Sequence, residues 1–381
     1  MPFWLLTDFS NEQVYNSKKA LAFIIFRFYF PGMRIIYLAT ALLIASWSTH
    51  PDQAVNYADL VNPLMGTQSK FSLSNGNTYP AIINENVART LEYAYADYCI
   101  WKLGKELGRP EEEIARFAAR CLNYKNVFDS TSNLMRGRNK DGAFQSPFSP
   151  FKWGDAFTEG NSWHYTWSVF HDIQGLIDLM GGAVTFENML DSVFKVPPVF
   201  DDSYYGFPIH EIREMQIMNM GNYAHGNQPI QHMIYLYNYA GKPWKTQHYI
   251  REVMNRLYHS GPDGYCGDED NGQTSAWYVF SAMGFYPVCP GNTQYVLGAP
   301  LFRNIEVNLE NGNTIWFIAD NNGPENRYVG SLKVNGKKYT KTWLDHGELM
   351  KGCKLQFRMD SNPKEVQLSD SDLPYSFSRD N

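Results

Sequence analysis

The sequence contains few cysteines, and their spacing does not suggest a metal site. Five cysteines are scattered over 381 residues. There is no CxxC pair and no zinc-type spacing, so a cysteine-based zinc site is excluded. Because five is an odd number, at least one thiol stays unpaired.

The sequence also lacks a run of basic residues. Its formal net charge is -6, and no stretch of Lys and Arg alternates with aromatic residues. A nucleic-acid-binding protein would show a basic stripe, so that class is excluded. The HExxH motif of zinc proteases and the EF-hand calcium loop are absent as well.

No comfortable membrane span is present near the N-terminus. The apolar run from Ile35 to Ala45 is too short for one. It follows Met33 and one basic residue and precedes small residues, which predicts a secretory signal peptide over 33–50. Residues 1–32 are then an upstream extension, and the protein is secreted or periplasmic in a bacterium. The alternative is an N-terminal anchor formed by "ALAFIIFRFYF", although Arg27 interrupts it.

Aromatic residues are abundant. The chain has 10 Trp, 25 Tyr and 24 Phe, and 44% of its residues are hydrophobic. This composition indicates a globular protein with a large core, and its length allows two domains. Aromatic rings suit both a core and a cleft that stacks on sugars.

The hydrophobic pattern divides the chain into regions. Residues 54–83 contain short β-like pieces between polar and glycine-rich stretches, whereas residues 84–292 show the spacing of helices. Residues 293–368 alternate in the manner of strands joined by Asn-Gly turns. Residues 369–381 are interpreted as a polar tail. Serial helical hairpins joined by loops indicate a mainly α fold, an incomplete (α/α)6 toroid with a small C-terminal antiparallel β unit.

The first chemical candidate lies in "FTEGNSWHYTW". Glu159 precedes a glycine, where the backbone can turn sharply, and Trp163 and His164 follow it. A carboxyl group among aromatic rings loses solvation, its pKa rises, and it can act as a general acid. Alternatively, Glu159 only complements the dipole of the next helix.

Two further junctions carry polar side chains. In "IHEIREM", His210 and Glu211 open a helix and could bind sugar hydroxyls or a metal, or simply face solvent. In "AHGNQPIQH", Asn227 and Gln228 offer the neutral oxygen ligands that calcium accepts. Asn227 is otherwise a helix cap before Pro229.

Three consecutive acids stand in "CGDEDNGQTSAW". Asp268 and Asp270 have room to act together in calcium binding and water activation, while Glu269 points elsewhere. Alternatively, these acids cap the helix that follows, although a cap needs only one acid. An acid and a base facing each other across a cleft would form the layout of an inverting glycosidase.

The order of these junctions resembles glycoside hydrolase family 92. The strings "EGNSWHYTW", "HEIREM", "YAHGNQPIQHMIYLYNYAGKPWKTQ" and "GDEDNGQTSAWYVFSAMGFYPVCPG" carry the resemblance, which covers residues 84–368 and a piece at 61–81. It implies an N-terminal β-sandwich joined to an (α/α)6 catalytic domain. It also implies a calcium-dependent, inverting exo-α-mannosidase that acts on mannose-containing glycans, with α-1,2 linkages as the expected target.

The resemblance assigns roles to individual residues. Glu159 matches the general acid, and Asp268 and Asp270 match the aspartate pair of the catalytic base and calcium region. The sugar-contacting residues of the family correspond to His210, Glu211, Trp163 and the neighbouring His164. The loop that borders the metal corresponds to Asn227 and Gln228.

The sequence departs from the family at one point. "NTYPAI" runs directly into "INENVAR", so most of the N-terminal domain and the first toroid helices are missing at about residues 81–84. Such a loss removes one wall of the substrate cleft. The alternatives to an active enzyme are therefore a truncated inactive relative and a non-catalytic mannoside-binding protein. Another (α/α)6 glycosidase, such as a trehalase-like enzyme, fits the motif strings less well.

Overall fold

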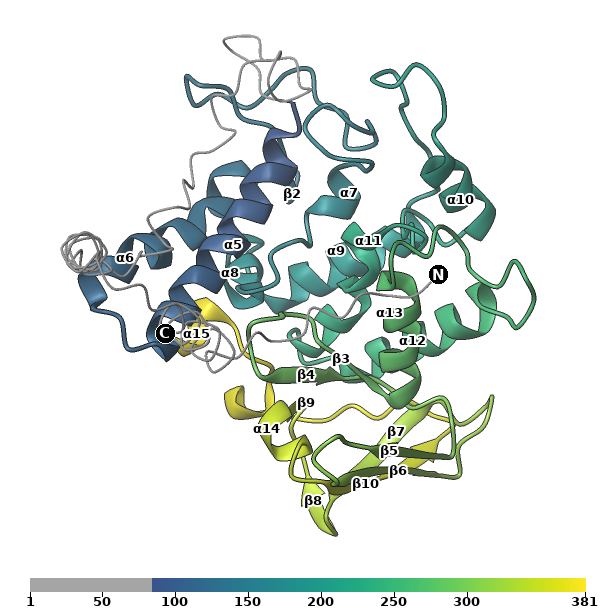
Figure 1. Cartoon of the computed structure of the whole chain (residues 1–381). Helices are drawn as coiled ribbons and strands as arrows, with labels where there is room; N and C mark the ends of the chain where they lie inside the picture. Colours follow the sequence, from purple (N-terminus) through teal and green to yellow (C-terminus); the bar gives the residue numbers. More distant parts are fainter. Residues whose placement is uncertain (1–83) are drawn as a thin grey trace, which may run out of the picture. The chain divides into compact units, whose positions relative to one another are not determined.

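Helices dominate residues 84–381, the part of the chain that the computed structural model describes (Figure 1). The expected extension at 1–32, the signal peptide at 33–50 and the β piece at 54–83 lie outside the described residues. Within the described part, no helix combines the length and apolar character needed to cross a bilayer.

The first described element is the expected helical hairpin. Helix α5 spans Asn86–Glu106 and α6 spans Glu111–Arg120, and a 3-10 helix η1 follows at Cys121–Val127. Helix α5 buries one face, which carries apolar residues at helical spacing: Val87, Leu91, Ala94, Tyr98 and Trp101. The pattern of apolar residues therefore predicted this hairpin correctly.

Short helices and loops then alternate along the chain. The helices are α7 Ser162–Tyr165, α8 Ile173–Leu179, α9 Ala183–Lys195, α10 His210–Met218, α11 Gln228–Gln231, η2 Met233–Asn238, α12 Pro243–Leu257 and α13 Gln273–Met283. The helical pattern over 162–182 does not form one continuous helix. The segment divides because the Asp172 side chain accepts the backbone N–H of Gly175 at 3.2 Å and so begins α8 as a new helix.

Large aromatic side chains fill the centre of the helical region. Trp153, Trp167 and Trp277 are completely buried in one continuous apolar core. Close packing of large side chains leaves few alternative arrangements, so this core fixes the helix ends from which the loops emerge.

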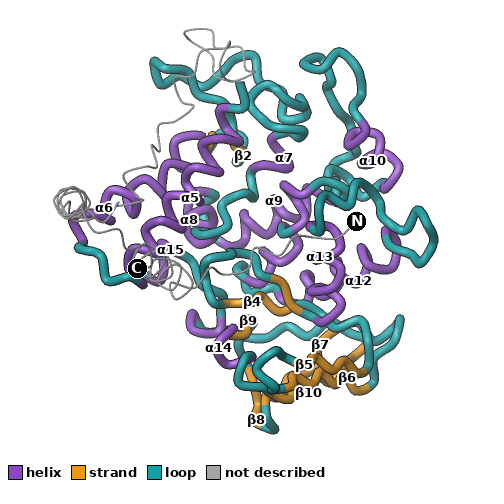
Figure 2. The backbone as a smooth tube through the Cα atoms, in the orientation of Figure 1, coloured by secondary structure: helices purple, strands orange, loops and turns teal. Residues whose placement is uncertain are grey.

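The β unit has an apolar core of its own. Its strands are drawn in orange in Figure 2. Its five-stranded sheet has the order β5-β6-β10-β7-β8, and a three-stranded sheet has the order β3-β4-β9. Every pair in these sheets is antiparallel except β6 and β10, which run parallel. The strand and helix bounds of this region are β3 Phe285–Tyr286, β4 Gln294–Leu297, β5 Asn304–Asn308, β6 Thr314–Asp320, β7 Tyr328–Val334, β8 Lys337–Tyr339, β9 Trp343–Asp345, α14 His346–Leu349 and β10 Cys353–Asp360.

A small two-stranded sheet, β1 Phe128–Asp129 with β2 Leu134–Met135, follows η1. It leads into the loop that carries Glu159. The hydroxyl of Ser162 in α7 donates to the carbonyl of Met135 at 2.5 Å. This contact ties the small sheet to the helix that begins just after Glu159.

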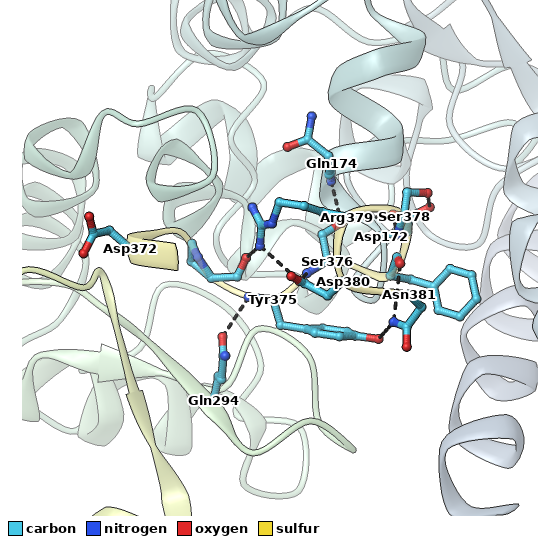
Figure 3. Close-up of polar contacts among 12 residues, drawn as sticks. Asp172, Gln174, Gln294, Asp372, Tyr375, Ser376, Ser378, Arg379, Asp380 and Asn381 are labelled. Atoms are coloured by element: carbon cyan, nitrogen blue, oxygen red, sulfur yellow. Dashed lines mark hydrogen bonds and ion pairs between the residues drawn. The ribbon is translucent and has the colours of Figure 1, made fainter. Parts of the chain in front are cut away.

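The C-terminal segment has a polar composition, as expected of a polar tail, but it is folded against the helical region (Figure 3). It contains η3 Asp370–Asp372 and α15 Phe377–Asp380. The buried carboxylate of Asp172 accepts the hydroxyl of Ser376 at 3.0 Å and both the backbone N–H and the hydroxyl of Ser378, at 2.8 and 2.6 Å. The end of the chain is thereby bound to the start of α8.

Candidate active site

Glu159 lies in a tightly held turn immediately before α7. Its φ of 46° is in the left-handed region, which side chains other than glycine rarely adopt. Its backbone N–H donates to the hydroxyl of Tyr205 at 3.2 Å, and its carbonyl accepts the side-chain amide of Asn227 at 2.6 Å. Two distant parts of the chain therefore hold this residue in an unusual conformation.

The carboxyl group of Glu159 has a raised pKa. Partial burial is the main cause, and the nearby carboxylates of Glu211 and Asp270 raise it further, while His210 lowers it. A carboxyl group with a raised pKa remains protonated at higher pH, which suits a general acid. Glu159 is therefore near both His210–Glu211 and Asp270, three residues that the sequence singled out.

His210 is bound by carboxylates at the start of α10. Its Nδ1 lies 2.9 Å from Oε1 of Glu214, and its Nε2 lies 3.1 Å from Oε1 of Glu211. The hydrogen bond to Glu214 is the main reason why the pKa of His210 is raised. The imidazole is 58% exposed, so it can reach a bound molecule, whereas Glu211 is buried.

The loop ahead of α11 connects the two candidate acids. Asn227 contacts the backbone of Glu159, and the amide of the next residue, Gln228, donates to a carboxylate oxygen of Asp270. Consecutive residues of one loop therefore contact Glu159 on one side and Asp270 on the other.

The three consecutive acids, Asp268, Glu269 and Asp270, have different surroundings. Asp268 is 70% exposed, with a carboxylate oxygen 4.0 Å from Nε2 of His210.

Glu269 turns in another direction from its two acidic neighbours. It accepts backbone N–H groups of Gly272 at 2.8 Å and Ser275 at 3.3 Å, at the start of α13. Hydrogen bonds from Ser275 and Gly272 lower its pKa. Glu269 is thus the helix-capping acid, which leaves Asp268 and Asp270 free for other contacts.

Two glycines allow the loops of the site to touch. A side-chain carbon added to Gly267 would lie 2.7 Å from the backbone of Gly226 and 2.7 Å from Oε2 of Glu214. A carbon added to Gly226 would lie 2.8 Å from the same oxygen. Such distances leave no room for a methyl group, so the contact between these loops depends on glycine.

Two more of the expected sugar-binding residues, His164 and Trp163, are buried, as Glu211 is. His164 is 3% exposed, and its Nδ1 accepts the backbone N–H of Asn161 at 3.1 Å. Asn161 in turn accepts the N–H of His164, which completes a capping box at α7. Burial lowers the pKa of His164 to about 3, so the ring is neutral. Trp163 is 9% exposed and belongs to the apolar core.

Glu159 also borders a cavity of about 630 Å³. Asn227, Gln228 and Gln273 line it, together with the aromatic residues Tyr95, Phe280 and Tyr286. A cavity of this size can accommodate a sugar-sized ligand, with aromatic rings and amides as walls.

The sequence reasoning missed Tyr205. The residue lies in the loop between α9 and α10 and contacts Glu159 across 46 positions of the chain. The only sequence signal is the aromatic stretch "YYGF" shortly before His210, which by itself does not distinguish a surface loop from part of a site.

Comparison with known families identifies the chain. The catalytic-domain model of glycosyl hydrolase family 92 matches residues 25–361. The chain belongs to glycosyl hydrolase family 92.

Solved members of family 92 share the fold of the described region. An inverting mannosidase from Bacteroides thetaiotaomicron VPI-5482 is 47% identical with a TM-score of 0.70, and the match covers 81% of this chain. A second family 92 structure from Bacteroides thetaiotaomicron, an α-mannosidase in complex with mannoimidazole, is 39% identical with a TM-score of 0.71 over 77% of this chain. An uncharacterized secreted glycosidase of Arthroderma benhamiae (strain ATCC MYA-4681 / CBS 112371) is 26% identical over 322 residues, which are 77% of this chain.

The chain is much shorter than these family 92 relatives. The matches cover 42% and 39% of the two bacterial chains and 38% of the fungal protein. The chain therefore spans about two fifths of the length of these relatives.

Proposed function

We propose that this chain carries the acid and base residues of an inverting exo-α-mannosidase that releases mannose from α-mannosides, with α-1,2 linkages as the first candidate. One observation carries the proposal. The consecutive residues Asn227 and Gln228 contact Glu159 and Asp270, which brings an acid with a raised pKa and a second carboxylate to one loop.

Glu159 is the proposed general acid. Its raised pKa keeps a proton available for the oxygen of the departing sugar, whose bond to mannose breaks as the proton is transferred. The charges of His210 and Glu211 both act on its carboxyl group. The exposed imidazole of His210 is proposed to exchange one of its carboxylate contacts for the departing sugar.

Asp268 or Asp270 is the proposed base. An inverting glycosidase needs a carboxylate that takes a proton from water while the water attacks from the face opposite the leaving group. Both aspartates are exposed, so water reaches them. Glu269 is excluded from this role because the start of α13 occupies its carboxylate oxygens.

A calcium ion is also proposed for the site. In residues 84–381 no cluster of three or more His, Cys, Asp and Glu side chains is arranged to hold a metal. A cation would instead need amide oxygens of Asn227 and Gln228, a carboxylate oxygen of Asp270 or Asp268, and water. Calcium accepts six to eight such oxygen ligands. When bound, calcium would supply positive charge for the 2- and 3-hydroxyls of mannose and favour a distorted ring.

The described helices are proposed to form part of an (α/α)6 toroid, with the site at one end. We further propose that the protein is secreted through the signal peptide that begins at Met33. The Arthroderma benhamiae relative, described as secreted, supports that destination.

Hydrolysis of α-1,2-mannobiose tests the function. The chain is expected to release mannose, and Glu159→Gln is expected to slow release by a factor of about 10² to 10⁴. Asp178→Asn, an exposed acid on α8, is the matched control and should leave the rate unchanged. Full activity in Glu159→Gln would remove the acid assignment.

Mannoside binding without turnover is the second candidate function. It is favoured because the match covers only about two fifths of the relatives' length, and parts of their clefts can lie outside the matched region. Binding of mannose measured by calorimetry, in a chain that releases no mannose, would support it over the enzyme.

A further inference from the structure

Four backbone groups around Glu159 are hydrogen-bonded to other parts of the chain. The carbonyl of Thr158 accepts the hydroxyl of Tyr165 at 2.6 Å, and the carbonyl of Gly160 accepts the N–H of Gly154 at 3.0 Å. Between these two contacts, the N–H of Glu159 donates to Tyr205 and its carbonyl accepts Asn227. A residue in a sparsely populated conformation persists only when its surroundings determine it in this way.

The loop that carries Tyr205 is itself fixed to the loop that carries Glu159. Asp201 donates its N–H to the carbonyl of Phe151 at 2.9 Å, and Trp153 donates its N–H to the carbonyl of Asp201 at 2.9 Å. A turn then follows, in which Tyr205 donates its N–H to the carbonyl of Asp202 at 3.0 Å. The hydroxyl of Tyr205 thus has a defined position relative to Glu159.

The hydroxyl of Tyr205 is a neutral acceptor. Partial burial raises the pKa of Tyr205 to about 12, so the side chain keeps its proton throughout the physiological range. The neighbouring Tyr204 differs in its contacts. Its ring packs edge-on against Tyr205 with centroids 5.1 Å apart, but its hydroxyl accepts an exposed hydrogen bond from the side chain of Asn84 at 3.3 Å.

We propose that Tyr205 is a positioning residue that holds Glu159 in the left-handed conformation and thereby directs its carboxyl group. Because a change of φ at Glu159 redirects its side chain, losing the Tyr205 hydroxyl lets the carboxyl group leave its working position. The role in catalysis rests on the proposed function, whereas the structural part does not.

Amide hydrogen exchange tests the structural part directly. Tyr205→Phe removes only the hydroxyl oxygen that accepts the N–H of Glu159. Tyr204→Phe is the matched control, because it removes the hydroxyl of the preceding residue, which does not contact Glu159. Exchange at the Glu159 amide, followed in a peptide covering 157–162, should become about fivefold faster in Tyr205→Phe. It should remain at the wild-type rate in Tyr204→Phe. Equal exchange rates in the two variants would overturn the proposal.

Kinetics with two leaving groups test the catalytic part. On α-1,2-mannobiose, where the departing sugar needs a proton, Tyr205→Phe should lower kcat about tenfold with little change in KM. On an aryl α-mannoside whose phenolate leaves unaided, the same variant should match the wild type. A simple loss of folded protein would lower both rates together and would contradict the positioning role.

The two proposals fail in different ways. If Glu159→Gln retains activity on mannobiose, the proposed function is wrong. If Glu159→Gln is inactive but Tyr205→Phe and Tyr204→Phe have the same kcat, only the role of Tyr205 is wrong. The exchange experiment decides the structural part even when no turnover is measured.

Discussion

The burial of Asp172 predicts that one substitution at the start of α8 destabilises the whole helical region. Its carboxylate accepts five hydrogen bonds, from the Gly175 backbone, the Tyr124 hydroxyl at 2.8 Å, the Ser376 hydroxyl, and the backbone and hydroxyl of Ser378. Asp172→Asn replaces one accepting oxygen with an NH₂ group. If the two donors to Oδ2, the hydroxyls of Tyr124 and Ser378, lose their acceptor, the expected loss is about 3–6 kcal/mol, at 1.5–3 kcal/mol for each bond to a charged group.

Urea unfolding followed by circular dichroism measures this loss. Asp178→Asn is the matched control, because Asp178 lies on the same helix but is exposed. The control is expected to change the free energy of unfolding by less than about 0.5 kcal/mol. Equal losses in the two variants at pH 7 would refute the reasoning.

Acidification should reduce the difference in the free energy of unfolding between Asp172→Asn and the wild type. Burial alone would raise the pKa of Asp172, but hydrogen bonds from Ser378, Tyr124 and Ser376 outweigh burial and lower it below the ordinary value of 3.8. A lowered pKa in the folded state means that the contribution to stability is present above 3.8 and is lost as the pH falls through the lower folded value. Burial lowers the pKa of the neighbouring His171 to about 4. Its neutral form is favoured in the folded state, so acid lowers the free energy of unfolding of both proteins through this residue as well. A difference that stays constant down to pH 2 would contradict this account.

Three further substitutions test the site and its supports. Gly267→Ala should lower kcat on mannobiose at least tenfold, because its methyl group meets the backbone of Gly226, whereas Gly323→Ala, which has open space, should match the wild type in the same assay. Glu269→Ala should lower the melting temperature by about 2 °C with unchanged KM, since it removes a cap and no sugar contact. His210→Ala should raise KM for mannobiose several-fold more than for an aryl mannoside, which steady-state kinetics on both substrates would measure.

Much of the helical architecture could be predicted from the spacing of apolar residues. Helices α5, α6, α9, α12 and α13 all lie within segments that the pattern indicated, because each buries one face against the core. The division of 162–182 into α7 and α8 was not predicted. It depends on the carboxylate of Asp172, which caps α8 while binding a segment two hundred residues away. Periodicity reports which face is buried and carries no information about such a contact.

The burial of His164 was harder to predict than the helices. The family resemblance placed His164 among the sugar-contacting residues, and in the structure its buried ring closes a capping box with Asn161. The spacing Asn-x-x-His was a usable signal, because a polar N-cap residue followed three positions later by an acceptor is typical of this box. Local capping geometry therefore separates a buried histidine from an exposed one such as His210.

The position of Glu159 illustrates what motif strings leave out. The glycine after Glu159 indicated a sharp turn, and the structure has a left-handed conformation at Glu159, at the surface. Its conformation depends on Tyr205 and Asn227, which lie 46 and 68 positions further along the chain. Neither contact follows from spacing, because each requires the helical core to bring separate loops to one end of the helices. The orientation of Glu159, the proposed general acid, therefore depends on the loops that hold it. For this chain, the rate of hydrogen exchange at the Glu159 amide reports directly on whether those loops hold it.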